Sequence, residues 1–494
     1  MKRINILLIV SLVMLTIAGT VTSNAVHAQG KPFDGVSFNV LTFTGPQIAE
    51  PLQRRAPDFE TATGASVSVI TVPFADLYQK ILTDAATGTN SYNAYVFAPQ
   101  WVVDFASPGY MQVLDDYIKK DDKIQWDDVA PFFRNFSATY SGKIYTVPLD
   151  GDFHMLYYRT DVFAKNGLKP PTTWQEYLDD AKKVNGQTFD GEKVYGSCIS
   201  KKRAAQAYWW IISFAAGMIQ SQGTSQGVFF DTTTFKPLVN NDAFIKALDT
   251  YKETSKYGPP NESTLDVGDT RGLWTSGKCA MTLDWGDIGP LAVAPGSKVG
   301  DKTGAVITPG SKEVLDRSTG KLVPCDKKTC PNAVDGVNYA PFASFGGWSG
   351  GVNAAAPQKV KDAAYAFLSY MSQPAQSGID VTIGKTGFNP YRLSHFKNLK
   401  PWTDSGMSEA FAKNYLGAIQ ASLNSPNMVL DLRIPQNQKY EQVILDTVLS
   451  QFLAGEMDDK AAAQAINDQW EATTNDIGRD AQLKAYISTL GIQK

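Results

Sequence analysis

Histidine and cysteine are scarce in this chain of 494 residues, which has three histidines and four cysteines. One histidine, His27, precedes the expected signal cleavage site described below, so only His154 and His395 remain as bases. Two histidines are too few for a typical zinc site, and no P-loop or dinucleotide-binding glycine pattern occurs. We therefore expect neither a metal nor an organic cofactor.

Charge of one sign is not in excess either. The chain has 46 lysines and arginines against 49 acidic residues, a formal net charge of -3 at pH 7, without long runs of one sign. Loss of Lys2 and Arg3 with the N-terminal segment would remove two positive charges and leave -5. Such a chain lacks the basic surface that nucleic acid or an anionic membrane attracts. We expect no nucleic-acid partner.

A strongly aliphatic, uncharged run lies near the N-terminus. It covers residues 6–18, follows two basic residues and precedes a plausible cleavage site after Ala28. Because the run is shorter than the roughly 20 residues of a spanning helix, residues 1–28 are predicted to be a secretory signal peptide. The first cysteine, Cys198, is too distant from this site to carry a lipid anchor. We expect a monomer without a stable membrane anchor in a Gram-negative periplasm.

The four cysteines of an exported protein predict two disulfides, for which the sequence allows three connectivities. Cys325 and Cys330 lie close together between two prolines and look like a small, locally closed loop. Cys198 and Cys279 would then pair by elimination. The alternative is that Cys198 and Cys279 are separate buried thiols.

Strand-like and helix-like segments alternate along the first part of the chain. Apolar alternation at residues 36–40 and 67–71 indicates strands, with a helical stretch at 48–61 between them, and a helix at 78–87 and a strand at 92–98 follow. Repeated alternation of this kind argues for α/β layers with a largely parallel sheet. At this length two domains are expected.

Residues 292–340 interrupt this order. They are rich in glycine, proline and lysine and show little apolar periodicity, which predicts an irregular insertion on the surface of a lobe. Helical spacing returns at 360–371, and residues 440–453 and 459–476 are predicted to form two more helices.

The most informative segment covers residues 142–181. Two apolar runs, 144–149 and 153–158, flank an acidic turn at 150–152 and are predicted to be strands. Two prolines then exclude helix, and a capping-box pattern at 173–176 is followed by apolar residues at helical spacing. A helix is therefore predicted to begin directly after Thr173.

With these segments the chain resembles the bacterial extracellular solute-binding proteins of ABC importers, the maltose-binding-like family. Five segments occur in the family's order: YTVPLDGD at the first crossing between lobes, SGKCAMTLDWGD at the return crossing, GGWSGGVNAAAPQKVKDAAYAFLSYMSQPAQS at the third crossing, TGFNPYRLSHF, and the tail from IPQNQKY to AGEMDDKAAAQAINDQW. The insertion between Asp287 and Phe342 and the cysteines depart from the family pattern, which leaves the identity of the ligand open.

The resemblance implies an α/β, two-lobed periplasmic-binding-protein fold in which each lobe is a mostly parallel sheet flanked by helices, with three hinge crossings. It assigns residues 29–148 and 286–349 to the N-terminal lobe, and residues 149–285 and 350–494 to the C-terminal lobe. The implied function is a periplasmic receptor that binds a carbohydrate or polyol between the lobes and delivers it to the permease subunits of an ABC importer. A receptor that also feeds a chemoreceptor or sensor kinase fits the sequence equally well.

The expected ligand contacts follow from sugar chemistry and from the resemblance. Sugar hydroxyls need carboxylates and amides, and the C–H faces of a sugar pack against aromatic rings. At the three crossings the expected contacts are Asp150, Asp152, Asp284, Trp285, Asp287, Trp348 and Ser349. The resemblance adds Gln47, Gln100, Trp101, Trp209, Trp210, Asn389 and Arg392.

Several of these contacts carry alternatives. Asp150 would instead belong to a capped turn, and the rings of Trp285 and Trp348 would instead pack in the hinge core. Trp209 and Trp210 point in different directions on a helix, so only one is expected to face the cleft. Arg392 would bind an acidic sugar through paired hydrogen bonds, or would form an ion pair with a local aspartate instead.

An enzyme is the main alternative class. Asp150 and Asp284 would be the acid and the nucleophile of a secreted glycosidase. A G-x-S-x-G match is centred on Ser349, but the residues after it look extended and run into Pro357. The strand-to-helix turn that presents a nucleophilic serine is therefore not expected, and we predict a binding protein without catalytic residues.

Overall fold

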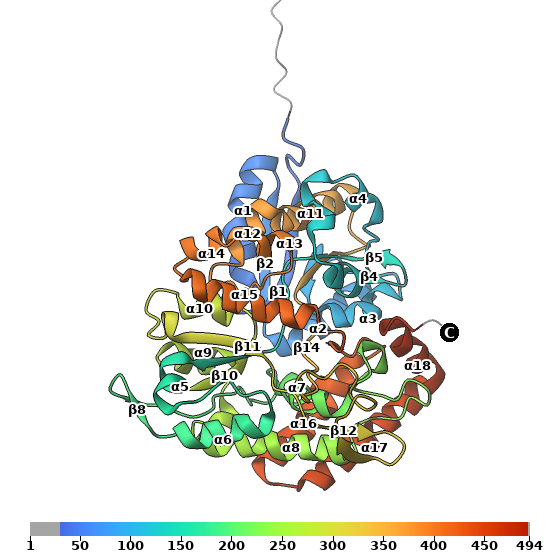
Figure 1. The fold of residues 1–494 in the computed structure, drawn as a ribbon. Coiled ribbons are helices and arrows are strands. Elements are labelled where there is room, and N and C mark those ends of the chain that lie inside the picture. The colour runs from blue at the N-terminus through green and yellow to red at the C-terminus, as the bar shows by residue number, and fades with distance from the viewer. Residues whose placement is uncertain (1–29, 493–494) are drawn as a thin grey trace, which may run out of the picture.

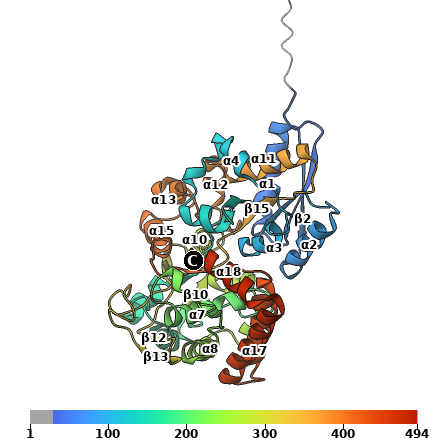
Figure 2. The same cartoon turned by 90° about the vertical axis from the view of Figure 1, so that its right-hand side faces the viewer.

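The computed structural model describes residues 30–492, which form two lobes of helices and strands (Figures 1 and 2). The predicted signal peptide, residues 1–28, lies outside the described residues. Between residues 30 and 492, no helix combines the length and the apolar character that crossing a membrane requires.

The first lobe is built on a five-stranded sheet in the order β2-β1-β3-β15-β6. Its strands are β1 (Ser37–Phe43), β2 (Ser66–Val72), β3 (Ala94–Phe97), β6 (Thr146–Pro148) and β15 (Ser349–Val352). β1 pairs in parallel with β2 and β3, whereas β15 runs antiparallel to β3 and β6. The carboxyl ends of the three parallel strands therefore meet at one edge of the sheet.

Three long helices cover this sheet: α1 (Ala49–Thr63), α2 (Phe74–Thr87) and α11 (Gln358–Ser372). α1 buries Leu52, Ala56 and Phe59 at helical spacing, and it packs against α11 and β2. Figure 2 places α1 and α11 above β2 and places α2 below it. α1 ends at Gly64, whose left-handed backbone (φ 79°) suits glycine.

The second lobe contains a three-stranded antiparallel sheet in the order β10-β7-β11. Its strands are β7 (Met155–Arg159), β10 (Met281–Asp284) and β11 (Thr303–Ile307), and it lies in the lower half of Figure 1. Helices surround this sheet and extend beyond it: α5 (Thr160–Asn166), α6 (Trp174–Val184), α7 (Ala207–Ile219), α8 (Asp242–Thr254), α9 (Val267–Thr275), α15 (Glu409–Leu423), α16 (Asp446–Ala454), α17 (Asp459–Ile477) and α18 (Arg479–Thr489). Every residue of α7 is buried, so this helix is the core of the helical layer.

The two-lobed α/β fold agrees with the sequence, but the expectation of a mostly parallel sheet in each lobe is wrong. The second-lobe sheet is antiparallel, and half of the strand pairings in the first sheet are antiparallel as well. The reason lies in the crossings: the chain leaves the first lobe through β6 and β7 and returns through β10 and β15, so outgoing and returning strands lie beside each other in opposite directions.

The chain also divides between the lobes differently from the expected boundaries. β11, which falls within residues 286–349, pairs with β7 of the second lobe. α11, which falls within residues 350–494, packs on α1 and β1 of the first lobe. Because β15 inserts between β3 and β6, the helix that follows it covers the first sheet.

Residues 292–340 are more regular than the sequence indicates. Apart from β11, they contain the antiparallel hairpin of β12 (Glu313–Asp316) and β13 (Lys321–Pro324), which packs against α7 and α8. Both expected disulfides are present, and the alternative of separate thiols is wrong. Cys325–Cys330 closes the loop after β13, and Cys198–Cys279 ties two neighbouring segments of the second lobe.

The start of α6 follows the predicted capping pattern with one difference. The hydroxyl of Thr173 accepts a hydrogen bond from the backbone N–H of Glu176 at 3.2 Å. The Glu176 carboxylate, however, accepts from the backbone N–H and the hydroxyl of Thr172, at 2.8 and 2.6 Å. The pattern therefore predicts the first residue of the helix, although the reciprocal bond is shifted by one residue.

Candidate ligand-binding cleft

A cleft of about 570 Å³ lies between the two lobes, at the carboxyl edge of the parallel strands. On the first-lobe side it is lined by residues that end or follow strands: Phe43 ends β1, and Phe74 lies two residues after β2. On the second-lobe side it is lined by Lys202, residues 204–206, the start of α9 and the residues after β10. Ligands of open α/β sheets typically bind at this edge.

Aromatic rings form a continuous wall of the cleft. The ring of Trp348 lies 4.6 Å from Phe43, 6.2 Å from Phe74 and 5.6 Å from Phe345 between centroids. Phe345 in turn lies 5.3 Å from Trp285. Phe43 and Phe74 belong to the first lobe, Phe345 and Trp348 to the third crossing, and Trp285 to the return crossing, so the wall spans both lobes.

Arg271, on α9, is buried between two aspartates of the return crossing. Its Nη2 and Nε donate to Oδ1 of Asp284 at 2.7 and 3.1 Å, and its Nη1 donates to Oδ2 of Asp287 at 2.6 Å. Although burial acts in the opposite direction, the two carboxylates raise the pKa of Arg271 above its ordinary value. Burial raises the pKa of Asp284, and the guanidinium opposes this rise. One fixed cation therefore serves two buried carboxylates.

Asp150 and Asp152, at the first crossing, form a second buried acidic cluster with Asn389. The side-chain amide of Asn389 donates to Oδ1 of both aspartates, at 3.0 and 2.9 Å. Burial raises the pKa of Asp150 to about 6. Burial, together with the neighbouring Asp150 charge, raises the pKa of Asp152 well above its usual range. Burial and mutual repulsion therefore oppose full ionisation of the pair.

Trp285 is held in the cleft wall by three neighbours. Its Nε1–H donates to Oε1 of Gln206 at 2.6 Å, and its carbonyl accepts from the hydroxyl of Tyr157 at 3.0 Å. The ring of His154 lies 4.4 Å from the Trp285 ring. Burial lowers the pKa of His154 well below its usual value, so the imidazole is neutral and acts as a packing group.

Eight of the predicted contacts are brought together at this cleft. Five of them line it: Gln47, Asp152, Trp285, Asp287 and Trp348. Three others lie directly behind the lining: Asp150 and Asn389 are hydrogen-bonded around Asp152, and Asp284 binds Arg271.

Trp209 and Trp210 do not line the cleft. Trp209 packs against Phe345 at 4.8 Å and donates its Nε1–H to Asp431 at 3.0 Å. Trp210 packs against His154 at 4.2 Å. The expectation that one of the two tryptophans faces the cleft is wrong, because both rings are fully enclosed behind the residues that form its wall.

Arg392 is a structural residue of the first lobe. Its guanidinium donates to the carbonyl of Ile124 at 2.9 Å and to the hydroxyl of Ser372 at 3.0 Å, and it pairs with Asp128 at 3.4 Å. Of the two interpretations, the ion pair with a local aspartate is the one that the structure contains.

The last three predicted contacts also lie outside the cleft lining. Ser349 is inside β15 and pairs with β3 and β6, so it is not on a strand-to-helix turn. Gln100 and Trp101 follow β3 but are buried: Gln100 donates to Glu441 at 3.5 Å, and the ring of Trp101 packs against Tyr78 at 5.4 Å. Residues after β1 and β2, among them Gln47 and Phe74, occupy the cleft edge instead.

Several lining residues are absent from the sequence-based prediction: Phe43, Phe74, Lys202, Gln206, Asp266 and Arg271. The two phenylalanines carry a detectable signal, because each stands at the carboxyl end of a predicted strand. Arg271 also has a detectable signal in the sequence, since it is the single basic residue of the helix that precedes the acidic return crossing. Lys202 and Gln206 lie in an irregular loop that has no such signal.

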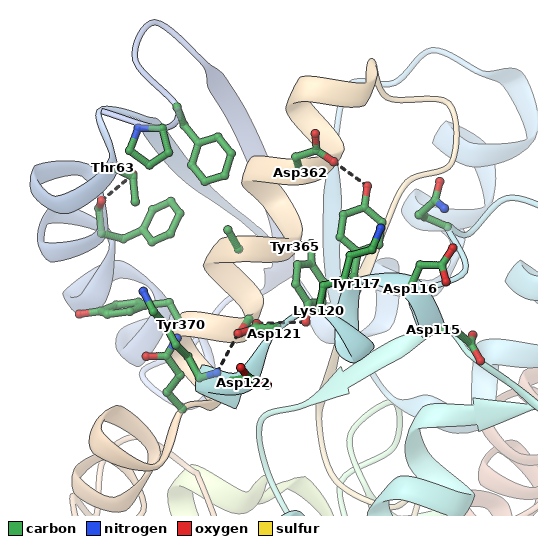
Figure 3. A pocket seen from close by; sticks show the side chains of 18 of the residues that line it. Thr63, Asp115, Asp116, Tyr117, Lys120, Asp121, Asp122, Asp362, Tyr365 and Tyr370 are labelled. Atoms are coloured by element: carbon green, nitrogen blue, oxygen red, sulfur yellow. Dashed lines mark hydrogen bonds between the residues drawn. The ribbon is translucent and has the colours of Figure 1, made fainter. Parts of the chain in front are cut away.

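A larger hollow of about 1340 Å³ lies on the first lobe, among α1, α4 (Asp115–Lys119) and α11. Figure 3 shows that its polar side chains point toward one another: Tyr117 donates to Asp362 at 2.7 Å, and Tyr365 donates to Asp121 at 3.1 Å. Because these groups already satisfy each other and belong to one lobe, the interlobe cleft is the better candidate for the ligand site.

Comparison with known proteins gives a consistent result. A family model described as bacterial extracellular solute-binding protein matches residues 45–377. The chain is 27% identical over 250 residues to a mannitol-binding protein of Pseudomonas aeruginosa, which is 50% of this chain and 54% of that protein. The chain thus spans about half of the length of the curated relatives that it matches first.

Solved structures share the fold over nearly the whole chain. An ABC transporter solute-binding protein from Agrobacterium radiobacter K84, in complex with ribitol, has a TM-score of 0.73 at 23% identity and covers 90% of this chain and 100% of its own. A second such protein, from Agrobacterium vitis S4 with bound D-mannitol, has a TM-score of 0.67 at 22% identity and covers 90% and 99%. At these identities the likeness establishes the two-lobed fold alone.

Proposed function

Because the chain belongs to the bacterial extracellular solute-binding protein family, we propose that it is a periplasmic receptor that binds a carbohydrate or polyol and delivers it to the permease of an ABC importer. The observation that carries this proposal is the composition of the cleft. An aromatic wall that spans both lobes faces buried carboxylates and a guanidinium, which is the combination that a hydroxylated ligand needs. The ribitol and mannitol bound by the relatives support the same class of ligand.

Each part of the cleft has a separate role in this proposal. The rings of Trp285 and Trp348 cover the C–H surface of the ligand, while Asp287 and Gln47 accept or donate hydrogen bonds at its hydroxyls. Arg271 holds the Asp287 carboxylate in a fixed orientation, so the acceptor is already positioned before the ligand arrives.

Ligand binding in this cleft would also favour lobe closure. A ligand that touches Phe43 and Gln47 on one side and Arg271 and Trp285 on the other stabilises the arrangement in which both sides contact it. We propose that this closed arrangement is the form that the permease recognises.

Calorimetric titration tests the proposal with ribitol, D-mannitol, tagatose and maltose as probes. We expect one of them to bind with 1:1 stoichiometry, and Trp285→Ala to weaken its binding at least about tenfold, because one face of the ligand loses its ring. The matched control is Trp126→Ala, which removes a half-buried ring outside the cleft and should leave the affinity unchanged. If the two variants bound the ligand with equal affinity, the ligand site would lie outside this cleft.

The glycosidase alternative receives no support from the geometry. Neither Asp150 nor Asp284 lines the cleft, and Asp284 is occupied by Arg271. Chromatography of the bound sugar after incubation checks this directly: recovery of unchanged ligand agrees with a receptor, and product formation would overturn the proposal.

A further inference from the structure

A third cavity, of about 500 Å³, shares no lining residue with the cleft. It is lined by the helical turn η4 (Phe133–Ala138), the hairpin of β4 (Thr139–Tyr140) and β5 (Lys143–Ile144), the strand β16 (Val429–Leu430) and the end of α18. η4 packs against β6 of the first lobe, whereas α18 packs against α17 of the second. In Figure 1 the end of α18 lies below β4 and β5. The cavity is therefore formed jointly by both lobes.

Arg433 lines this cavity and is 4% exposed. Its two terminal nitrogens donate to the backbone carbonyls of Phe136 and Thr139, and its Nε–H has no hydrogen-bond partner within residues 30–492. A guanidinium has five N–H donors, so donors remain for a further acceptor.

Within residues 30–492 the charge of Arg433 is also uncompensated by a carboxylate. Four arginines of the described chain are buried, and the other three each pair with a carboxylate: Arg159 with Asp161, Arg271 with Asp284 and Arg392 with Asp128. No carboxylate of residues 30–492 lies within 4.0 Å of Arg433, the distance that defines such a pair. Burial lowers the pKa of Arg433 to about 10, so the group keeps its charge at neutral pH. Buried charges are normally paired, and this one points to an acceptor that the described chain does not supply.

The rest of the lining defines what kind of anion fits. The guanidinium lies over the rings of Phe136 and Tyr140, at 5.3 and 5.6 Å. Phe132, Met428 and Leu430 add further apolar surface to the same cavity. An inorganic ion would leave this surface in contact with water, whereas an organic anion would cover it.

We propose that this cavity is a second ligand site, which binds a small organic carboxylate through Arg433 and buries the apolar body of that ligand against Phe136, Tyr140 and Leu430. The carboxylate accepts the free N–H donors of the guanidinium and neutralises it, and the apolar part fills the remaining space. This site does not rest on the function proposed for the cleft.

Its position links the site to the cleft. Asp431, two residues before Arg433, accepts hydrogen bonds from the backbone N–H of Phe345 at 2.7 Å and from the Trp209 ring at 3.0 Å. Gly346, the next residue of the third crossing, receives a hydrogen bond from Ser137 of η4 at its carbonyl oxygen. A ligand on Arg433 therefore stiffens the segment that positions one ring of the cleft wall.

The experiment uses the purified full chain, with sodium benzoate as the probe. Benzyl alcohol has the same ring without the charge, and inorganic phosphate has the charge without the ring. We expect calorimetry to give saturable benzoate binding that is at least about tenfold tighter than binding of either other probe, because both a charge-assisted hydrogen bond and apolar burial are needed. In methyl-labelled protein the Met428 resonance should shift with benzoate, which locates the probe in this cavity, since no methionine lines the cleft.

Arg433→Gln should abolish benzoate binding. Arg317→Gln is the matched control, because Arg317 also donates to backbone carbonyls and has no carboxylate within 4.0 Å in the described chain. If Arg433→Gln does not fold, Ser488→Glu is used in its place. Ser488 is an exposed residue at the rim of the cavity, so a glutamate there would repel benzoate and weaken its binding several-fold. The uncharged variant Ser488→Gln should leave benzoate binding unchanged. Equal binding of benzoate and benzyl alcohol, an unshifted Met428 resonance, or full binding by Arg433→Gln or Ser488→Glu would each overturn the proposal.

Discussion

Replacement of Arg271 by glutamine should destabilise the protein strongly. The Arg271 side chain is 6% exposed, and the side chains of Asp284 and Asp287 are each 2% exposed. Glutamine keeps part of the volume but removes the only cation that these carboxylates share within residues 30–492. Breaking a buried ion pair by removing one partner costs about 3–5 kcal/mol. We expect the free energy of unfolding at pH 8 to fall by about that amount.

The loss should depend on pH in a defined direction. The pKa of Asp284 is already raised in the folded protein by burial, and Arg271 limits the rise. Without Arg271 this pKa should rise further. A carboxyl with a raised folded pKa binds its proton more tightly in the folded state, so its ionisation opposes folding above that pKa, and the penalty disappears as the pH falls through it. The variant should therefore lose less stability at pH 5 than at pH 8.

Urea unfolding followed by tryptophan fluorescence at the two pH values measures both effects. Arg134→Gln is the matched control, since Arg134 pairs at 2.7 Å with Asp127, which is 98% exposed, and such surface pairs contribute little. A loss that is equal at pH 5 and pH 8 would refute the idea that uncompensated carboxylates cause it. A loss no larger than that of the control would refute the role of the buried cluster altogether.

Two further predictions concern the crossings and the disulfides. Cys279→Ser opens a link between residues 81 apart and should cost about 4.5 kcal/mol. Cys330→Ser opens one between residues 5 apart and should cost about 2 kcal/mol, and urea unfolding without reductant compares the two variants. Gly347→Ala should lower the melting temperature far more than Gly320→Ala. Both glycines have φ above +70°, so the backbone strain of alanine is similar at the two positions. A Cβ at Gly347 would lie 2.1 Å from the carbonyl oxygen of Asp150, whereas a Cβ at Gly320 would meet nothing within 4 Å.

The sequence predicts the crossings well because each combines a strand with a polar residue at its end. β6 falls within the first apolar run, and β7 overlaps the second and ends one residue beyond it. Trp285 and Trp348 line the cleft from their places after and before a strand. The helix after Thr173 is equally well predicted, since capping and periodicity are local properties.

The direction of the strands and the choice of lining residues depend on tertiary structure instead. The sequence of β10 does not indicate that this strand pairs antiparallel with β7, because the apolar pattern of a strand is the same for either direction of pairing. The family resemblance places Trp209 and Trp210 near the cleft and the helical spacing lets one of them face it, but every position of α7 is buried, so neither ring reaches the cleft. Gln100 is polar and follows β3 as required, yet Glu441 from a distant segment covers it.

The charge state of the cleft limits the ligands that it can accept. Its buried acids are not freely ionised, since burial and mutual repulsion oppose full ionisation of Asp150 and Asp152, and Arg271 binds Asp284 and Asp287. An anionic ligand would meet carboxylates, and the neighbouring guanidinium of Arg271 already donates to two of them. A neutral ligand with many hydroxyls meets no such repulsion, because each hydroxyl both donates and accepts. This is the physical reason to expect a polyol or sugar rather than an acid in the cleft, with Arg433, not Arg271, as the group that remains available for an anion.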